Sequence, residues 1–312
     1  MKWSLASLVV LAVLTCGYAS AQTLYKYRGE NGEWIYSDRP PNDDRVTEDR
    51  ELGQPVPPAE VIVTYKLFSN KVELVAHNGF YAPVEIELFI DSIVGVENPH
   101  PDNRLRWVVP PRSDLTMLSL AFLDGAAVPE LEYHFDYLPG DPTSQHQPTD
   151  GYRVPFSAGS SHPITQAHPS TRTHRTLDSI HAVDIAMPVG TDVVAARDGI
   201  VFDVASNYFR AGLDLERDGQ SANVLRILHD DGTYAIYAHL NRNTIRVKLG
   251  DSVLAGDYIA DSGNTGFSSG PHLHFAVQRN AGMRTDSLPV VFKGPTSGGV
   301  VPETGNVLTA YP

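Results

Sequence analysis

Residues 262–275 read SGNTGFSSGPHLHF, and this stretch decides both the fold class and the place to look for chemistry. A run rich in Gly and Ser ends in His272-Leu273-His274-Phe275, an alternating pattern typical of a β-strand. Because strand side chains alternate between faces, His272 and His274 are expected on one face, with Leu273 and Phe275 buried on the other. Two imidazoles on one strand face can act together around one metal ion.

Two other segments contribute side chains of the same chemistry. Residues 225–239 read LRILHDDGTYAIYAH, in which the DDG turn at 230–232 separates two apolar, strand-like runs. This pattern predicts a β-hairpin with His239 at the end of its returning strand. Residues 181–188 read HAVDIAMP and contribute Asp184.

Taken together, these segments resemble the LytM/lysostaphin-type zinc metallopeptidases and follow that family's order along the chain. The resemblance rests on residues 184–191 (DIAMPVGT), 195–201 (AARDGIV), 222–224 (ANV), 229–233 (HDDGT), 237–240 (YAHL), 250–251 (GD), 262–266 (SGNTG) and 269–275 (SGPHLHF). It implies an all-β fold whose catalytic domain is an antiparallel β-sheet of the lysostaphin-like, duplicated-hybrid type. It also implies a zinc metalloendopeptidase that hydrolyses peptide bonds in peptidoglycan stem peptides or cross-links.

The resemblance also implies roles for individual residues. Asp184 and His274 match the family's zinc ligands, whereas His239 and His272 match its catalytic histidines. One zinc ion per catalytic domain is expected, with no other cofactor. Two His and one Asp leave a position open for water, which is typical of catalytic zinc. The expected mechanism is attack by the zinc-bound water, with a histidine as general base or oxyanion stabiliser.

The third zinc ligand departs from the common motif of the family. That motif has a histidine four residues before the aspartate, where this chain has Ile180. A branch of the family instead carries a Ser/Thr-His pair further upstream of its Ala-Val-Asp, and Thr173-His174 stands at that spacing. His174 is therefore predicted as the third ligand. The alternatives are His181, His162 and His168.

Two other functions fit the same residues. Some members of the family have lost metal ligands and act as non-catalytic regulators or activators of other cell-wall hydrolases, and the completeness of the ligand set discriminates this interpretation from an enzyme. A different exported metallopeptidase with a protein substrate is the other alternative.

The first 21 residues predict a secretory signal peptide. Lys2 precedes an apolar run at 8–14 (LVVLAVL), and Ala19-Ser20-Ala21 forms a small-residue cleavage site. Cleavage after Ala21 and a periplasmic location are expected. The only cysteine, Cys16, lies in this segment, so the mature chain draws its metal ligands from His, Asp and Glu.

The remaining sequence predicts further β-rich modules. Residues 22–50 predict a small N-terminal hairpin and resemble a short proteobacterial envelope domain of unknown function. Residues 59–138 predict a β-sandwich-like module for spacing, for packing on the catalytic domain, or for binding an envelope partner through 22–138. Polar, Pro-containing linkers are expected at 43–58 and 139–150, and the metallopeptidase domain at 151–312.

Charge and hydropathy limit the kinds of partner that the chain is expected to bind. The formal net charge is −13, from 24 basic and 37 acidic residues, so the chain lacks the basic surface that nucleic acid requires. After the signal segment, no apolar stretch is long enough to span a membrane. Peptidoglycan is the expected partner.

Overall fold

The computed structural model describes residues 22–30, 32–37, 39–45, 47–52, 59–97, 102, 104–123, 130–149, 151–170, 172–295 and 298–312. The predicted signal peptide, residues 1–21, lies outside the described residues. Across the described ranges the secondary structure is nearly all strand, with one short helix, α1 (Leu215–Asp218), which confirms the all-β prediction. The chain separates into two compact units, Met1–Pro57 and Pro58–Pro312, and each is described by itself.

The N-terminal unit is a three-stranded antiparallel sheet in the order β2-β1-β3. Its strands are β1 (Gln22–Arg28), β2 (Trp34–Ser37) and β3 (Thr47–Leu52). The predicted hairpin is β1–β2, and β3 adds a strand within the stretch expected to be a linker. A two-stranded hairpin is marginal alone, so the third strand gives β1 a second hydrogen-bonded neighbour.

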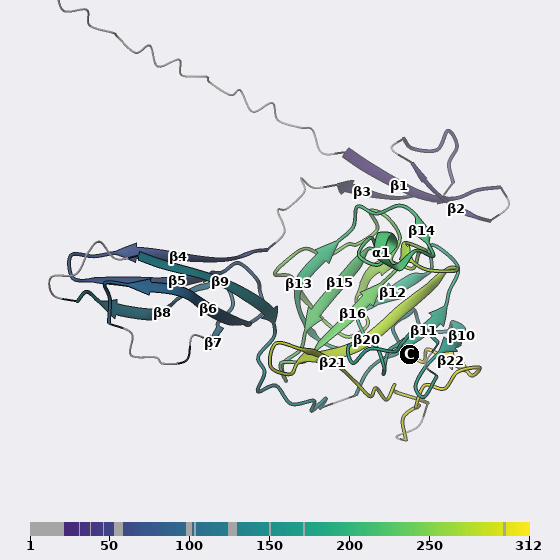
Figure 1. Ribbon diagram of the computed structural model, residues 1–312. Coiled ribbons are helices and arrows are strands. Elements are labelled where there is room, and N and C mark those ends of the chain that lie inside the picture. Colours follow the sequence, from purple (N-terminus) through teal and green to yellow (C-terminus); the bar gives the residue numbers. More distant parts are fainter. Residues whose placement is uncertain are drawn as a thin grey trace, which may run out of the picture. The chain divides into compact units, whose positions relative to one another are not determined.

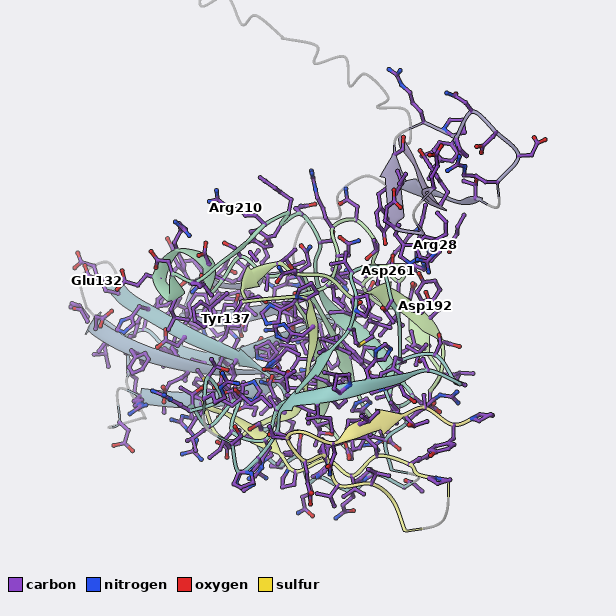
Figure 2. The ribbon with its side chains drawn as sticks, turned by 90° about the vertical axis from the view of Figure 1, so that its right-hand side faces the viewer. Arg28, Glu132, Tyr137, Asp192, Arg210 and Asp261 are labelled. Carbon is purple, nitrogen blue, oxygen red and sulfur yellow. The ribbon has the colours of Figure 1, made fainter. Side chains whose placement is uncertain are left out.

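The second unit begins with two three-stranded antiparallel sheets, β4-β5-β8 and β7-β6-β9, which share one hydrophobic core. The strands are β4 (Val61–Leu67), β5 (Lys71–Asn78), β6 (Val84–Val94), β7 (Arg104–Val109), β8 (Ser113–Ala121) and β9 (Glu130–Pro139). Alternate residues of β6, from Val84 to Ile90, fill this core, as a sandwich requires. Figure 2 labels Glu132 and Tyr137 toward opposite ends of β9.

The largest element is a nine-stranded sheet in the order β17-β13-β15-β16-β20-β11-β10-β22, with β21 also paired to β20 (Figure 1). Its strands are β10 (Ser161–Gln166), β11 (Val183–Ala186), β13 (Gly199–Ala205), β15 (Val224–Leu228), β16 (Tyr234–Ala238), β17 (Ser252–Val253), β20 (His272–Asn280), β21 (Thr285–Leu288) and β22 (Val307–Thr309). All of these pairings are antiparallel. Leu273, Phe275 and Val277 of β20 are fully buried, which confirms the alternation expected from the sequence.

Two short strand pairs lie outside this sheet. An antiparallel pair joins β12 (Asp192–Val194) to β18 (Tyr258–Asp261), and Figure 2 labels Asp192 and Asp261, which are opposite each other in this pair. A parallel pair joins β14 (Ala211–Gly212) to β19 (Gly266–Phe267). The second pair includes Gly266, the last residue of the SGNTG segment quoted in the sequence analysis.

The sandwich and the large sheet are in direct contact. Asn280, at the end of β20, donates from Nδ2 to Glu85 Oε2 (2.9 Å) and to the Gly140 carbonyl (3.1 Å). Phe202 and Tyr234 of the large sheet are buried in the sandwich's core cluster. Of the roles expected for the sandwich module, packing on the neighbouring domain is therefore observed.

The expected linker at 139–150 is fixed to the large sheet in its described part. The Gln147 amide donates to Asp231 Oδ2 (3.0 Å), and Arg279 Nη1 donates to the Ser144 carbonyl (3.3 Å). Its Pro and polar composition indicated a spacer, but these hydrogen bonds are made to residues distant in sequence. The predicted domain boundaries stay a prediction.

In the described part of the chain, no helix has the length and apolar character needed to cross a membrane.

Candidate metal centre

Three neighbouring strands bring the predicted site residues together. Strand β20 lies between β11 and β16, and the register places Asp184 opposite His274 on one side. On the other side Ala238 is opposite His274, so His239 follows directly after the paired part of β16. His272 and His274 share one face of β20, as the alternation predicted.

His174, Asp184 and His274 form a group that could hold a metal ion. Each offers one ligand atom, and these atoms all lie within 4.8 Å of one another. His174 Nε2 is 3.2 Å from Asp184 Oδ1, and His274 Nδ1 is 2.9 Å from the same oxygen. Tetrahedral zinc with bonds near 2.0–2.1 Å separates its N and O ligands by about 3.3 Å. The donor types and the spacing therefore fit zinc.

His174 reaches this group from the irregular segment between β10 and β11. Gln166, the last residue of β10, is opposite Asp184 in the sheet and is buried. Its amide donates to Thr173 Oγ1 (3.0 Å), and its Oε1 accepts from the Thr173 backbone amide (3.3 Å). Since Thr173 precedes His174, this bridge holds the imidazole beside the carboxylate.

The histidines considered as alternative third metal ligands contact other side chains. The rings of His168 and His181 contact each other in a tilted arrangement, with their centroids 4.8 Å apart. The ring of His162 lies edge-on against Phe156 at 4.7 Å. Among the described residues, only the group with His174 meets the spacing of a metal site. The geometry thus favours His174 as the third ligand.

The Asp184 carboxylate stays charged in this setting. Burial would raise its pKa, but hydrogen bonds from His174 and His274 outweigh burial and hold the pKa well below its usual range. An anionic oxygen between two imidazoles is a suitable arrangement for a divalent cation.

His239 and His272 stand beside the candidate ligands. Their rings are 4.5 Å apart between centroids, and the His239 ring is 5.9 Å from that of His274. His272 Nε2 lies 3.8 Å from Asp184 Oδ1. Both histidines therefore border the point where the three candidate ligands converge.

Hydrogen bonds fix the tautomers of both rings. His239 Nδ1 is 2.6 Å from the Thr265 carbonyl oxygen, and His272 Nδ1 is 2.8 Å from that of Gly270. A carbonyl only accepts, so each Nδ1 carries a proton and donates it. In the neutral form of such a ring Nε2 is unprotonated, and this is the nitrogen able to accept a proton.

His239 is neutral near pH 7. Burial lowers its pKa to about 3, with further lowering from the nearby His272 and His274. Its backbone has φ of 61°, in the left-handed region that side chains other than Gly rarely adopt. Such a conformation costs energy and persists only where neighbours hold it, as is common at functional sites.

The sequence reasoning missed the residues that hold these two rings. The carbonyls of Thr265 and Gly270 accept from His239 and His272, and Ser268 Oγ lies 3.3 Å from His272 Nδ1. These residues lie in or next to the SGNTG and SGPHLHF segments, on which the family resemblance partly rests. The sequence analysis thus named the segments, but a backbone carbonyl acceptor cannot be recognised from residue type.

Comparison with known proteins identifies the domains. Residues 178–286 match the sequence model of peptidase family M23, and residues 10–60 match that of DUF4124, a domain of unknown function. The chain therefore carries an M23 peptidase domain, of a metal-dependent family, preceded by a DUF4124 domain. His174 lies just before the matched M23 segment.

Two of the relatives are an uncharacterized metalloprotease of Haemophilus influenzae and the peptidoglycan DD-endopeptidase ShyA of Vibrio cholerae. The first is 34% identical over 46% of this chain and 26% of its own length. ShyA is 38% identical over 31% of this chain and 20% of its own length. The chain thus matches only a minor part of each relative.

Among solved structures, the catalytic domain of EnpA, a prophage-encoded M23 protein from Enterococcus faecalis solved as a point mutant, is similar at 28% identity. The match covers 43% of this chain and 92% of that chain, with a TM-score of 0.32.

Proposed function

We propose that residues 151–312 form a zinc metalloendopeptidase that cuts peptide bonds in peptidoglycan. The observation that carries this proposal is the convergence of His174, Asp184 and His274 on one point, with His272 Nε2 and the His239 ring beside it. Family membership alone would not suffice, because members that lack ligands are inactive. Here the complete set of three ligands and two catalytic histidines favours an enzyme over a non-catalytic regulator.

The metal ligands are proposed to be His174 Nε2, Asp184 Oδ1 and His274 Nδ1. Zinc, when bound there, supplies a Lewis acid and lowers the pKa of water toward about 7. Two neutral imidazoles and one carboxylate leave a single net positive charge and an open position.

His239 and His272 are proposed to move the proton. Each ring donates Nδ1–H to a backbone carbonyl and so keeps an Nε2 lone pair toward the site. A ring that accepts the proton of the attacking water becomes an Nε2–H donor, which can stabilise the oxyanion or protonate the leaving amine. The burial of His239 favours its neutral form, so its Nε2 is unprotonated near pH 7.

The substrate class is proposed from the relatives. ShyA is named a peptidoglycan DD-endopeptidase, and a relative from Staphylococcus capitis, 35% identical over 32% of this chain, is named a glycyl-glycine endopeptidase. Both names describe endopeptidases, which is the reaction proposed here. Export to the periplasm, through the predicted signal peptide, would bring the domain to such a substrate.

The proposal is tested with purified sacculi and a soluble protein substrate in parallel. We expect the full mature chain to release peptide-cleaved muropeptides from sacculi, to lose this activity on chelation, and to regain it with zinc. Cleavage of the protein substrate alone would indicate an exported protease of different specificity. Absence of cleavage of both substrates by zinc-loaded protein would favour the regulator.

A further inference from the structure

Both proposed catalytic histidines depend on one short segment, residues 265–270. The Thr265 carbonyl accepts from His239 Nδ1 (2.6 Å), and the Gly270 carbonyl accepts from His272 Nδ1 (2.8 Å). Ser268 Oγ donates to the Gly270 carbonyl (2.9 Å) and thereby ties that acceptor to the rest of the segment. Where this segment lies decides where both Nε2 atoms point.

The segment is held from outside by residues 208–212. The Gly266 amide donates to the Arg210 carbonyl, and the Ser268 amide donates to the Gly212 carbonyl, both at 3.0 Å. These bonds make up the parallel β14–β19 pair, which has only two residues in each strand. So short a pair is weak alone, and residues 208–212 need an anchor of their own.

Asn223 is that anchor. Its side chain is fully buried, accepts from the Tyr208 amide (2.9 Å) and donates to the Tyr208 carbonyl (2.8 Å). The same Nδ2 also donates to the Leu240 carbonyl (3.0 Å), directly after His239 in the chain. One amide group thus joins the start of 208–212 to the end of β16.

A second set of bonds connects the same residue to the segment itself. The Asn223 backbone amide donates to Thr265 Oγ1 (3.0 Å), and that hydroxyl donates to the Leu240 carbonyl (3.0 Å). Asn223 therefore contacts residue 265, which positions His239, and also fixes 208–212, which positions 266–268. The contacts of the Asn223 side-chain amide described above are all to main chain, of Tyr208 and Leu240.

We infer that Asn223 is a positioning residue that keeps His239 and His272 aimed at the metal centre. The inference rests on the proposed roles of these two histidines. Without the amide, the Tyr208 backbone groups and the Leu240 carbonyl lose a hydrogen-bond partner, and this loss favours rearrangement. Misplacement of catalytic groups by about 1 Å can cost about 100-fold in rate.

Asn280 offers a matched control. It is equally buried and also uses its amide to bridge two distant elements, Glu85 and Gly140, but at the other end of β20. We expect Asn223→Ala and Asn280→Ala both to lower the Tm. Only Asn223→Ala is expected to reduce kcat, by about 100-fold, with KM and zinc content retained.

A readout independent of turnover uses NMR of ¹⁵N-labelled histidine rings in the full mature chain. In the wild type, His239 and His272 should show protected Nδ1–H signals. Asn223→Ala should lose this protection at temperatures where it is folded, and Asn280→Ala should keep it. If Asn223→Ala leaves the ring signals and kcat unchanged, the inference is wrong.

A second variant covers the case in which Asn223→Ala does not fold. Thr265→Val removes the hydroxyl between the Asn223 amide and the Leu240 carbonyl, and should broaden or shift the His239 ring signal. Unchanged ring signals in a folded Thr265→Val protein overturn the inference. A wild type that shows the protected rings but cuts no sacculi would instead contradict the proposed function alone.

Discussion

The two ends of strand β20 make opposite use of polar side chains. At its start, His272 Nε2 and His274 Nδ1 lie 3.8 Å and 2.9 Å from one oxygen of Asp184, at the candidate metal centre. At its end, Asn280 donates to Glu85 and Gly140, and its Oδ1 accepts from the Gly282 amide (2.9 Å). We therefore expect the first end, where histidines gather around one carboxylate, to carry out chemistry. We expect the second end, where both atoms of the amide are hydrogen-bonded, to contribute stability.

The sandwich also contains polar side chains that are hydrogen-bonded to one another. Glu87 is almost fully buried, and both Arg104 and Arg106 donate to it. These bonds hold the pKa of the Glu87 carboxyl below its ordinary value, led by the Arg104 hydrogen bond. Because these charged groups pair with one another, we assign the network a structural role.

The largest expected effect is the difference between two histidine substitutions near the candidate metal centre. His174→Ala should abolish stoichiometric zinc binding and reduce cleavage by about 1,000-fold or more, because one of three ligands is lost. His181→Ala should retain zinc and activity, since the His181 ring packs against His168 instead. Zinc content by elemental analysis and cleavage rates test the pair. Zinc retained in His174→Ala and lost in His181→Ala would reverse the ligand assignment.

A pH effect on stability is expected from a buried histidine distant from the metal end. Burial lowers the pKa of His229 to about 4, whereas the unfolded chain has the ordinary value of 6.5. The unfolded state then binds the proton first, so stability is complete above pH 6.5 and falls as pH drops toward 4. The loss reaches about 3 kcal/mol at about 1.4 kcal/mol per pKa unit.

Urea unfolding at pH 7 and at about pH 4.5 measures this loss, with His229→Gln as the control. The variant should lose this part of the pH dependence. An identical pH dependence in both proteins would show that other groups cause it.

A smaller effect is expected at the closed end of β20. Asn280→Ala should reduce the free energy of unfolding by about 1–3 kcal/mol, because Glu85 and the Gly140 carbonyl lose a buried donor. Cleavage at a temperature where the variant is folded should match the wild type. Denaturant titration with parallel activity assays tests this. Lost activity in a stably folded variant would show that the Asn280 end of β20 also contributes to catalysis.

The smallest effect is expected at an exposed ion pair. His77 Nδ1 and Asp114 Oδ1 are 2.7 Å apart, but both side chains are about half exposed or more. His77→Ala should change the free energy of unfolding by no more than about 0.5 kcal/mol, since surface pairs contribute little. A larger loss would show that this exposed ion pair contributes more to stability than its exposure predicts.

Much of this was predictable because strands impose a simple geometry. Alternation placed His272 and His274 on one face, and the turn at 230–232 placed His239 at a strand end. Resemblance to a family supplied Asp184. Long-range pairing was less accessible, because the contact between Asn280 and Glu85 joins residues 195 positions apart.

His174 shows the limit most clearly. No periodicity connects it to Asp184, because it lies on an irregular segment whose path is set by Thr173 and Gln166. Likewise, the acceptors for His239 and His272 are backbone carbonyls, which every residue possesses. Their role depends on where the chain runs and is not visible in residue identity.

The most direct test of the central claim is mass spectrometry of muropeptides after digestion of sacculi by the zinc-loaded mature chain and by Asp184→Asn. The account predicts that the wild type releases fragments with a new amino and a new carboxyl terminus at one peptide bond, whereas Asp184→Asn, with its anionic ligand removed, releases none. Equal cleavage by both proteins, or none by a wild type shown to bind one zinc, would contradict it.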